Sequence, residues 1–240
     1  GGAASGLLQV SLEGSRKERA FSTRSEPGPA ESIFEFVDLS PGKYTVILEP
    51  AAVLDLVGFM FWDFGGQSLL DERSFLTNRI GTKLFGDDIS IMDDVYHPLQ
   101  SGPQFDGEGI PRKRVSLVEN GVIKNLVFSR KSAAKMKTTP LAEKLDHVEP
   151  TGHSFPLPND IGDAPVNIVF SATAPNKTQS VEKMIEGTEK GILVTRCWYI
   201  REVEPYEKIL TGMTRDGTFL VEKGKISHGV LNFRFNQSLV

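Results

Sequence analysis

From Lys113 onward the sequence alternates short β-rich runs with turn-forming residue pairs, and this alternation constrains the fold most strongly. Asn120-Gly121 is the clearest turn pair, because a type I′ turn needs positive φ at both central residues and fixes the register of its strands. Lys223-Gly224 is a weaker signal of the same kind. The runs that we expect to be strands are 114–118, 122–128, 166–171, 191–200, 218–221, 225–226 and 231–235. This pattern predicts a mainly antiparallel sheet.

The remaining periodic segments add two strands and two helices. Apolar residues alternate with polar ones over 8–12, and β-branched and aromatic residues fill 44–48, so both segments are expected to be strands. Pro50 suits the first turn of a helix, and apolar residues recur at helical spacing over 52–60. One amphipathic helix is expected within 178–190. Without βαβ repetition, the fold class is α+β, a β-rich domain with a few helices.

Composition excludes several classes of protein. The 240 residues carry a net charge of -4, which gives no broad attraction for phosphate backbones, so we expect no direct nucleic-acid binding. A single Cys cannot form an internal disulfide. The longest apolar run, 53–64, contains two Asp and is shorter than the roughly 20 residues of a membrane span. We therefore expect a cytoplasmic protein without membrane association.

The His residues give only weak metal candidates. His147 and His153 form the one dense group, but six positions separate them and Pro150 interrupts any helix between them. Zinc ligands on a helix normally stand one turn apart. We expect both imidazoles to be free at the surface, within a long irregular segment over 138–165.

Other polar groups are interpreted as structural. The acidic group at 93–97 is expected to be a solvated turn, and the loop 105–109 places two carboxylates between glycines that shape the backbone. Residues 212–217 are interpreted as a similar turn. Cys197 lies in an apolar strand with no base indicated nearby, so it is expected to be a small buried residue.

Several segments together resemble one known family. The order of these motifs is similar to that in the TldD/PmbA family, also called modulators of DNA gyrase. The segments are 105–125, 151–153, 190–203, 210–226 and 234–238. The resemblance implies an α/β N-terminal domain followed by a β-rich C-terminal domain, and a dimer or heterodimer that cleaves peptides in an enclosed cavity. It also implies zinc in the metal-bearing members, held by a His-Glu-x-x-x-His type helix and a Cys near the C-terminus.

This sequence departs from the metal-binding pattern of the family. The helix positions that the resemblance assigns to the metal site are occupied by Leu54, Asp55 and Phe59. Cys197 does not correspond to the family's metal Cys, which follows the segment 234–238. The resemblance is therefore to the metal-free, PmbA-like branch. We expect no catalytic residue and no cofactor in this chain.

The resemblance also implies domains, partners and a binding surface. Residues 1–43 are expected to be a remnant of, or linker from, an N-terminal α/β domain, and 44–240 the C-terminal domain. The expected partners are a second copy or a TldD-like paralogue, with a peptide or unfolded protein as substrate. Two alternatives are an active metallopeptidase with ligands outside this segment and a non-enzymatic interaction domain. The expected substrate-binding residues are Arg196, Trp198, Tyr199, Thr211, Thr214 and Arg215.

Overall fold

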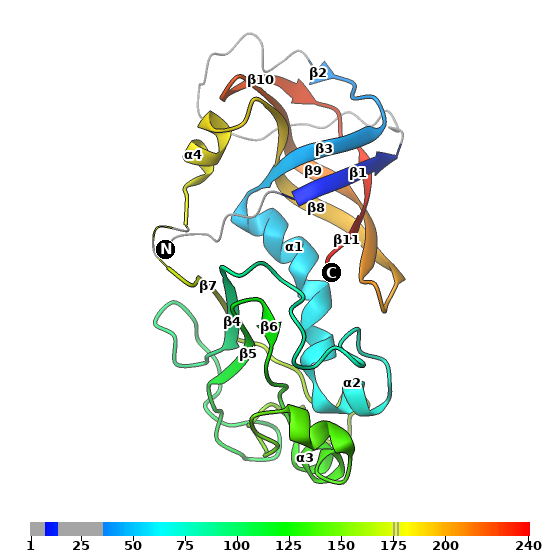
Figure 1. Ribbon diagram of the computed structural model, residues 1–240, viewed down its shortest axis with the longest axis vertical. Helices are drawn as coiled ribbons and strands as arrows, with labels where there is room; N and C mark the ends of the chain where they lie inside the picture. The colour runs from blue at the N-terminus through cyan, green and yellow to red at the C-terminus, as the bar shows by residue number, and fades with distance from the viewer. Residues whose placement is uncertain (1–7, 14–35, 175, 177) are drawn as a thin grey trace. The chain divides into compact units, whose positions relative to one another are not determined.

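A computed structural model describes residues 8–13, 36–174, 176 and 178–240 (Figure 1). The chain divides into two compact units. The first comprises residues 1–59 and 178–239, and the second comprises residues 60–177 with Val240. Each unit has its own sheet, and the two are described separately below.

The first unit is built around a closed ring of five strands, which we call the strand ring. It consists of β1 (Leu8–Glu13), β3 (Gly42–Leu48), β8 (Lys190–Glu204), β9 (Ile209–Glu222) and β11 (Arg234–Ser238). The ring closes because β11 pairs with both β1 and β9. Two more strands, β10 (Lys225–Val230) and β2 (Phe36–Val37), extend the sheet from β9. Apart from the parallel pairs β3–β8 and β10–β2, the pairings are antiparallel.

Two helices belong to the first unit wholly or in part. The helix α1 (Pro50–Phe61) follows β3 directly, and Ala52 and Leu56 enter the core inside the strand ring. Strand residues Val46, Ile192 and Val194 complete the centre of that core. On the other face of the sheet, α4 (Val181–Glu186) packs its apolar residues near Leu193 and Val221. The strand ring therefore has an apolar interior and a helix on its outside.

The second unit contains a four-stranded antiparallel sheet in the order β6-β5-β4-β7. Its strands are β4 (Ile89–Asp93), β5 (Val115–Glu119), β6 (Val122–Ile123) and β7 (Ile168–Ala172). Its helical elements are η1 (Trp62–Phe64), α2 (Gly66–Leu70), α3 (Arg130–Met136) and η2 (Pro140–Lys144). Phe64, Phe75 and Phe128 are fully buried between these elements. Long loops make up much of this unit, and they cover its apolar core.

Several sequence predictions are confirmed. The Asn120-Gly121 and Lys223-Gly224 turns both have positive φ at each residue and join β5 to β6 and β9 to β10. The expected strands at 8–12 and 44–48 and the helix from Pro50 are present. The amphipathic helix within 178–190 is shorter than expected, with Ser180 as its N-cap. The fold class, α+β with mainly antiparallel sheets, is confirmed.

One prediction about the strands is wrong, and another lies mostly beyond what the structure describes. Residues 212–217 are not a turn but part of the continuous strand β9, which pairs with β8 on one side and with β11 or β10 on the other. Its polar residues Arg215 and Asp216 are both exposed, at the point where the β8–β9 register shifts. Most of the remnant or linker expected over 1–43 falls outside the described residues, so the boundary at residue 44 stays a prediction. None of the helices in the described part of the chain is long and apolar enough to cross a bilayer.

Candidate functional site

The helix α1 places three predicted residues in different environments. Leu54 is 61% exposed, whereas Phe59 packs against the core of the strand ring. The Asp55 carboxylate accepts hydrogen bonds from Arg196 through Nε at 2.9 Å and Nη2 at 3.1 Å, and from the Cys197 backbone N–H at 2.9 Å. Both oxygens of Asp55 are therefore engaged by β8. Because Leu and Phe carry no ligating atom, these residues do not fit a zinc ion.

Four of the predicted substrate-binding residues gather on the outside of β8 and β9. Trp198 and Tyr199 are 41% and 56% exposed, and their ring centroids lie 6.0 Å apart. The Arg215 guanidinium lies over Trp198 at 4.7 Å, and Arg201 lies over Tyr199 at 4.9 Å. Arg196 is directly opposite Arg215 in the strand register. We call these residues, Arg196, Trp198, Tyr199, Arg201 and Arg215, the arginine–aromatic surface.

A backbone irregularity creates this surface. The β8–β9 register shifts between Trp198 and Arg201, and Tyr199 has a φ of 52°. In a regular strand, neighbouring side chains point to opposite faces. The irregularity instead brings the two neighbouring rings together, and each carries an arginine on its face. Arg201 was not among the residues predicted from sequence, because nothing in a polar strand end signals such stacking.

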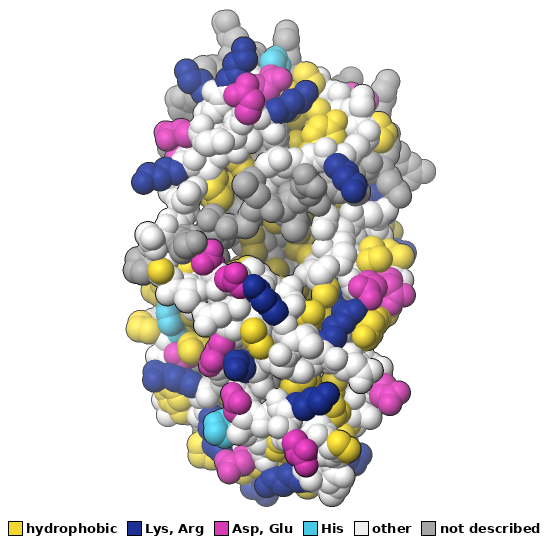
Figure 2. Space-filling model, in the orientation of Figure 1, with side chains coloured by type: hydrophobic (Ala, Val, Ile, Leu, Met, Phe, Trp, Pro, Cys, Tyr) yellow, Lys and Arg dark blue, Asp and Glu magenta, His cyan; other side chains and the backbone are white. Residues whose placement is uncertain are grey.

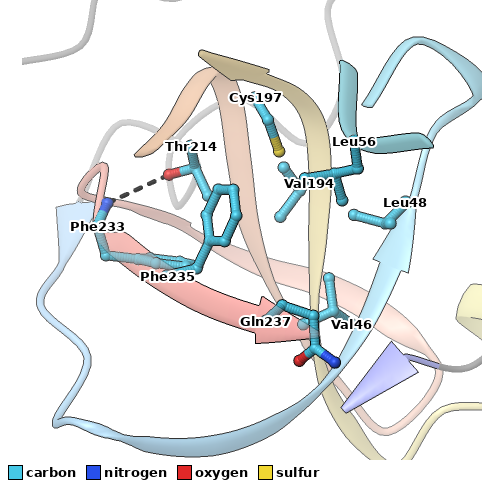
Figure 3. A pocket seen from close by; sticks show the side chains of 9 residues that line it. All are labelled: Val46, Leu48, Leu56, Val194, Cys197, Thr214, Phe233, Phe235 and Gln237. Carbon is cyan, nitrogen blue, oxygen red and sulfur yellow. Dashed lines mark hydrogen bonds between the residues drawn. The ribbon is translucent and has the colours of Figure 1, made fainter. Parts of the chain in front are cut away.

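The other two predicted residues are less exposed, although Thr211 is the strand partner of Arg201. Thr211 is half-buried, and its hydroxyl donates to the Phe235 carbonyl at 3.2 Å. Thr214 is buried inside the strand ring, where its hydroxyl oxygen accepts the Phe233 N–H at 3.2 Å (Figure 3). Thr214 therefore faces the core of the strand ring, and its role in substrate binding stays a prediction.

Cys197 is also directed into the strand ring. Figure 3 shows its sulfur pointing toward Val194 and Leu56. Burial raises the pKa of the thiol to about 12, and the nearby Asp55 carboxylate adds to this effect, while Arg196 opposes it. A thiol with such a pKa supplies almost no thiolate at neutral pH. The prediction of a small buried residue is confirmed.

The second unit contains a buried polar cluster centred on Asp93. Its Oδ1 accepts a hydrogen bond from Arg112 Nη2 at 2.6 Å, and its Oδ2 accepts the backbone N–H groups of Val166 and Asn167, each at 2.7 Å. His153 Nε2 lies 2.9 Å from Oδ1, but at an angle that does not make a good hydrogen bond. At the other side of the ring, Nδ1 lies 2.9 Å from the Thr151 carbonyl oxygen, which can only accept. We call Asp93, Arg112 and His153 the buried triad.

Electrostatics explain the ionisation of Asp93. Burial raises the pKa of Asp93. Three neighbours outweigh this effect and lower the pKa to about 2. They are His153, which acts through its close contact and its charge, then the Asn167 N–H, and then Arg112. Arg112 and His153 have only 3% and 0% of their side chains exposed. The expectation of a solvated turn at 93–97 is therefore wrong for Asp93 and Asp94, which are both buried.

A cleft of about 520 Å³ opens above the buried triad. Its lining combines Arg112 and His153 with apolar residues from the same loops, including Phe105, Phe155 and Val166. The Asp106 carboxylate accepts N–H groups from Glu108 and Ile110, and this confirms that the loop 105–109 shapes the backbone.

The two His candidates are separated by their environments. His147 is exposed, as expected, whereas His153 is 4% exposed, so the prediction of a surface imidazole is wrong for His153. The loop carries His153 inward because Gly152, with a φ of 77°, lies against the Pro111 carbonyl where a side chain would clash. In the part of the chain that the structure describes, no three His, Cys, Asp or Glu side chains are grouped to hold a metal ion.

Known proteins resemble this chain in sequence and in fold. The family model described as the PmbA/TldA metallopeptidase C-terminal domain matches residues 41–240. The chain belongs to the TldD/PmbA family. A protein of Methanothermobacter thermautotrophicus named "Metalloprotease" is 24% identical over 156 residues, which are 63% of this chain and 31% of that protein.

Two solved structures share the fold of this TldD/PmbA-family chain. A putative modulator of a DNA gyrase from Thermotoga maritima is 26% identical with a TM-score of 0.72, over 87% of this chain and 45% of that one. TldE from Thermococcus kodakarensis is 22% identical with a TM-score of 0.70, over 88% of this chain and 45% of that one. The chain spans between 22% and 32% of the length of the curated relatives that it matches.

Proposed function

We propose that this TldD/PmbA-family chain is a subunit that binds peptides but does not hold zinc, acting in a dimeric, peptide-cleaving assembly. The observation that carries the proposal is that the residues of α1 at the family's metal positions are apolar or already bonded. Asp55, the only carboxylate at the family's metal positions, is bound to Arg196 and to the Cys197 backbone, and Leu54 and Phe59 flank it. An ion pair thus joins the helix to β8, so neither oxygen of that carboxylate is free for a metal.

A strand edge beyond Cys197 supports peptide binding. β3 pairs with β8 only as far as Val194, and the Cys197 N–H donates to Asp55 of α1. Within the described residues no strand pairs with that side of β8 beyond this point. An extended peptide can add to such an edge through backbone hydrogen bonds, while side-chain contacts set its preference. The arginine–aromatic surface lies along this part of β8. Exposed rings with stacked guanidinium groups suit aromatic, aliphatic and acidic side chains of an unfolded substrate.

The assembly is tested by co-expression with a metal-bearing paralogue. We expect the two chains to purify together, with hydrolysis of a denatured protein by the pair and none by this chain alone. Stoichiometric zinc with hydrolysis by the isolated chain would instead favour an active metallopeptidase. A strict monomer that binds neither the paralogue nor denatured peptides would favour a non-enzymatic interaction domain.

Peptide binding is tested separately with a fluorescein-labelled unfolded peptide. Trp198→Ala and Arg215→Ala are each expected to weaken binding about tenfold, as for a central interface residue. Phe36→Ala is the matched control, because Phe36 is 43% exposed on β2, at the other end of the same sheet. Equal losses in all three variants would contradict a specific role for the arginine–aromatic surface.

A further inference from the structure

Arg201 is the one cation of the arginine–aromatic surface that has no carboxylate partner among the described residues. Arg196 and Arg215 each pair with an aspartate. The Arg201 guanidinium instead donates from Nη2 to the Tyr199 hydroxyl at 3.0 Å. A guanidinium carries five N–H donors in a fixed plane. Because Arg201 is exposed, its charge and its remaining donors are available to a ligand.

The chain supplies no negative charge to Arg201 from the neighbouring strand positions. Glu202 pairs with the buried Lys208, and Glu204 accepts a backbone N–H at 2.9 Å. The residue opposite Arg201 on β9 is Thr211, which is uncharged. Opposite charges at facing positions of adjacent strands stabilise their pairing. A strand added on the other side of β8 could therefore supply the charge that is absent among the described residues.

The backbone of β8 places Trp198 and Arg201 on one face by means of one extra residue. Trp198 pairs with Met213 and Arg201 pairs with Thr211, so three steps along β8 match two steps along β9. The irregular stretch includes Tyr199, whose φ of 52° is a conformation that residues other than glycine rarely adopt. Extra residues of this kind re-aim side chains and are frequent beside functional sites.

The strained backbone at Tyr199 serves an exposed side chain. Tyr199 is 56% exposed, whereas the next residue, Ile200, packs against the core of the strand ring. Strain of this kind at an exposed residue points to a role in function rather than in packing. The ring of Tyr199 lies 4.9 Å from the Arg201 guanidinium, and its hydroxyl accepts the Arg201 hydrogen bond. The guanidinium is therefore held in place before any ligand binds.

We infer that Arg201 and Tyr199 form a carboxylate-binding site that selects substrates with an acidic residue two positions from an aromatic one. This site rests on the proposed function, because an extended peptide must first add to the β8 edge beyond Cys197. Alternate residues of that peptide share a face, and the β9 partners of Trp198 and Arg201 are two residues apart. The aromatic ring of the peptide then lies against Trp198 and its carboxylate against Arg201. The Tyr199 O–H adds a second donor, since its oxygen already accepts from Arg201.

The test compares three acetylated and amidated peptides. The in-phase peptide, Ser-Glu-Ser-Phe-Ser-Glu-Ser, has an acid two positions from Phe for either strand direction. The out-of-phase peptide, Ser-Ser-Glu-Phe-Glu-Ser-Ser, has the same composition and charge but presents its acids to the other face. The neutral peptide is the in-phase one with Gln in place of Glu. Binding is followed by the fluorescence of Trp198 in a Trp62→Phe background.

The in-phase peptide should bind about tenfold more tightly than the other two, the effect of one hydrogen bond to a charged group. Equal binding of all three would overturn the carboxylate-binding site but leave the proposed function standing, since a peptide would still bind. Equal binding of the two acidic peptides would show general attraction between charges and would also overturn the site. If none of the three binds, the site and the proposed peptide binding both fail.

Arg201→Gln tests the cation directly. It should abolish the preference for the in-phase peptide and leave the affinity for the neutral peptide nearly unchanged. Lys225→Gln is the matched control, because Lys225 is exposed on β10 of the same unit and the substitution removes the same charge. An equal loss of preference in the control would overturn the assignment to Arg201.

Tyr199→Gly separates the site from the strand that carries it. Glycine adopts a positive φ without strain, so the midpoint of thermal unfolding should not fall. The variant should nevertheless lose the preference for the in-phase peptide, because Arg201 loses the ring and the hydroxyl that hold it. A variant that keeps the full preference would show that Tyr199 is not part of the site.

Discussion

Asp93→Asn should destabilise the second unit strongly. The side chain of Asp93 is fully buried, and its two oxygens face Arg112, His153 and two backbone N–H groups. An amide keeps one acceptor oxygen and turns an NH₂ group toward donors at the other position. It also leaves the Arg112 guanidinium buried without a counter-charge. Breaking a buried ion pair in this way costs about 3–5 kcal/mol.

The pKa of Asp93 gives a second estimate of the same quantity. A decrease from the model-compound value of 3.8 to about 2 corresponds to about 2 kcal/mol of net preference for the ionised carboxylate. Both figures give a loss of unfolding free energy of at least about 2 kcal/mol. The amide also removes a hydrogen bond from a backbone N–H, which adds to the loss.

The assay exploits the two Trp residues of the chain, one in each unit. In a Trp198→Phe background, urea unfolding followed by fluorescence reports Trp62 and hence the second unit. Asp71→Asn is the control, because Asp71 pairs with Arg73 at the surface, where such a pair contributes about 0–1 kcal/mol. If Asp93→Asn shifts the free energy of unfolding no more than the control does, the account of the buried triad is refuted.

Three further predictions follow from single sites. The folded-state pKa of Asp93 lies below its unfolded value, so the stability that its carboxylate contributes is complete above about pH 4 and is lost as pH falls through about 2. The acid unfolding of the second unit, followed by Trp62 fluorescence, should therefore no longer show this pH-dependent loss of stability in Asp93→Asn. Native Cys197 should not react with a thiol reagent at pH 8, and one equivalent should react after unfolding, because its pKa is about 12; fast native reaction would contradict its burial. Gly121→Ala should lower the midpoint of thermal unfolding more than Gly109→Ala. Both glycines have positive φ, but of the two only Gly121 would bring a Cβ against a carbonyl oxygen, at 2.2 Å. Equal decreases would show that this close approach does not affect stability.

Local signals predicted local structure well. The Asn120-Gly121 turn followed from the backbone freedom of two residues, and the apolar face of α1 followed from helical spacing. These features depend on neighbours in the sequence. They did not require knowledge of which strands meet, and the α+β class followed from them.

Long-range pairing was not accessible in the same way. The strand at 8–12 was predicted without a partner, and the structure pairs it with both β3 and β11. Residues 212–217 appeared to be a turn because of Thr214, Arg215 and Asp216. Thr214 is in fact buried in the strand ring, whereas Arg215 and Asp216 are both exposed where the β8–β9 register shifts. A strand held by a partner distant in sequence tolerates polar residues on its exposed face, and the local sequence does not show this pairing.

The candidate sites were predicted in unequal measure. Arg196, Trp198, Tyr199 and Arg215 were chosen from sequence and lie together, although whether they bind a substrate stays a prediction. The buried triad was missed, because Asp93, Arg112 and His153 come from three distant segments that each resemble solvated loops. The one available signal was that Asp93 ends a β-branched run, a position that the sheet buries.

The most direct test of the central claim is the zinc content of the purified chain. The chain is equilibrated with zinc, dialysed and measured by elemental analysis. Because Asp55 is engaged by Arg196 and the Cys197 backbone, with Leu54 and Phe59 as its neighbours at the family's metal positions, the account predicts no stoichiometric zinc. Asp55→Asn should leave that result unchanged. One equivalent of zinc that is lost in Asp55→Asn would show that α1 binds metal and would contradict the account.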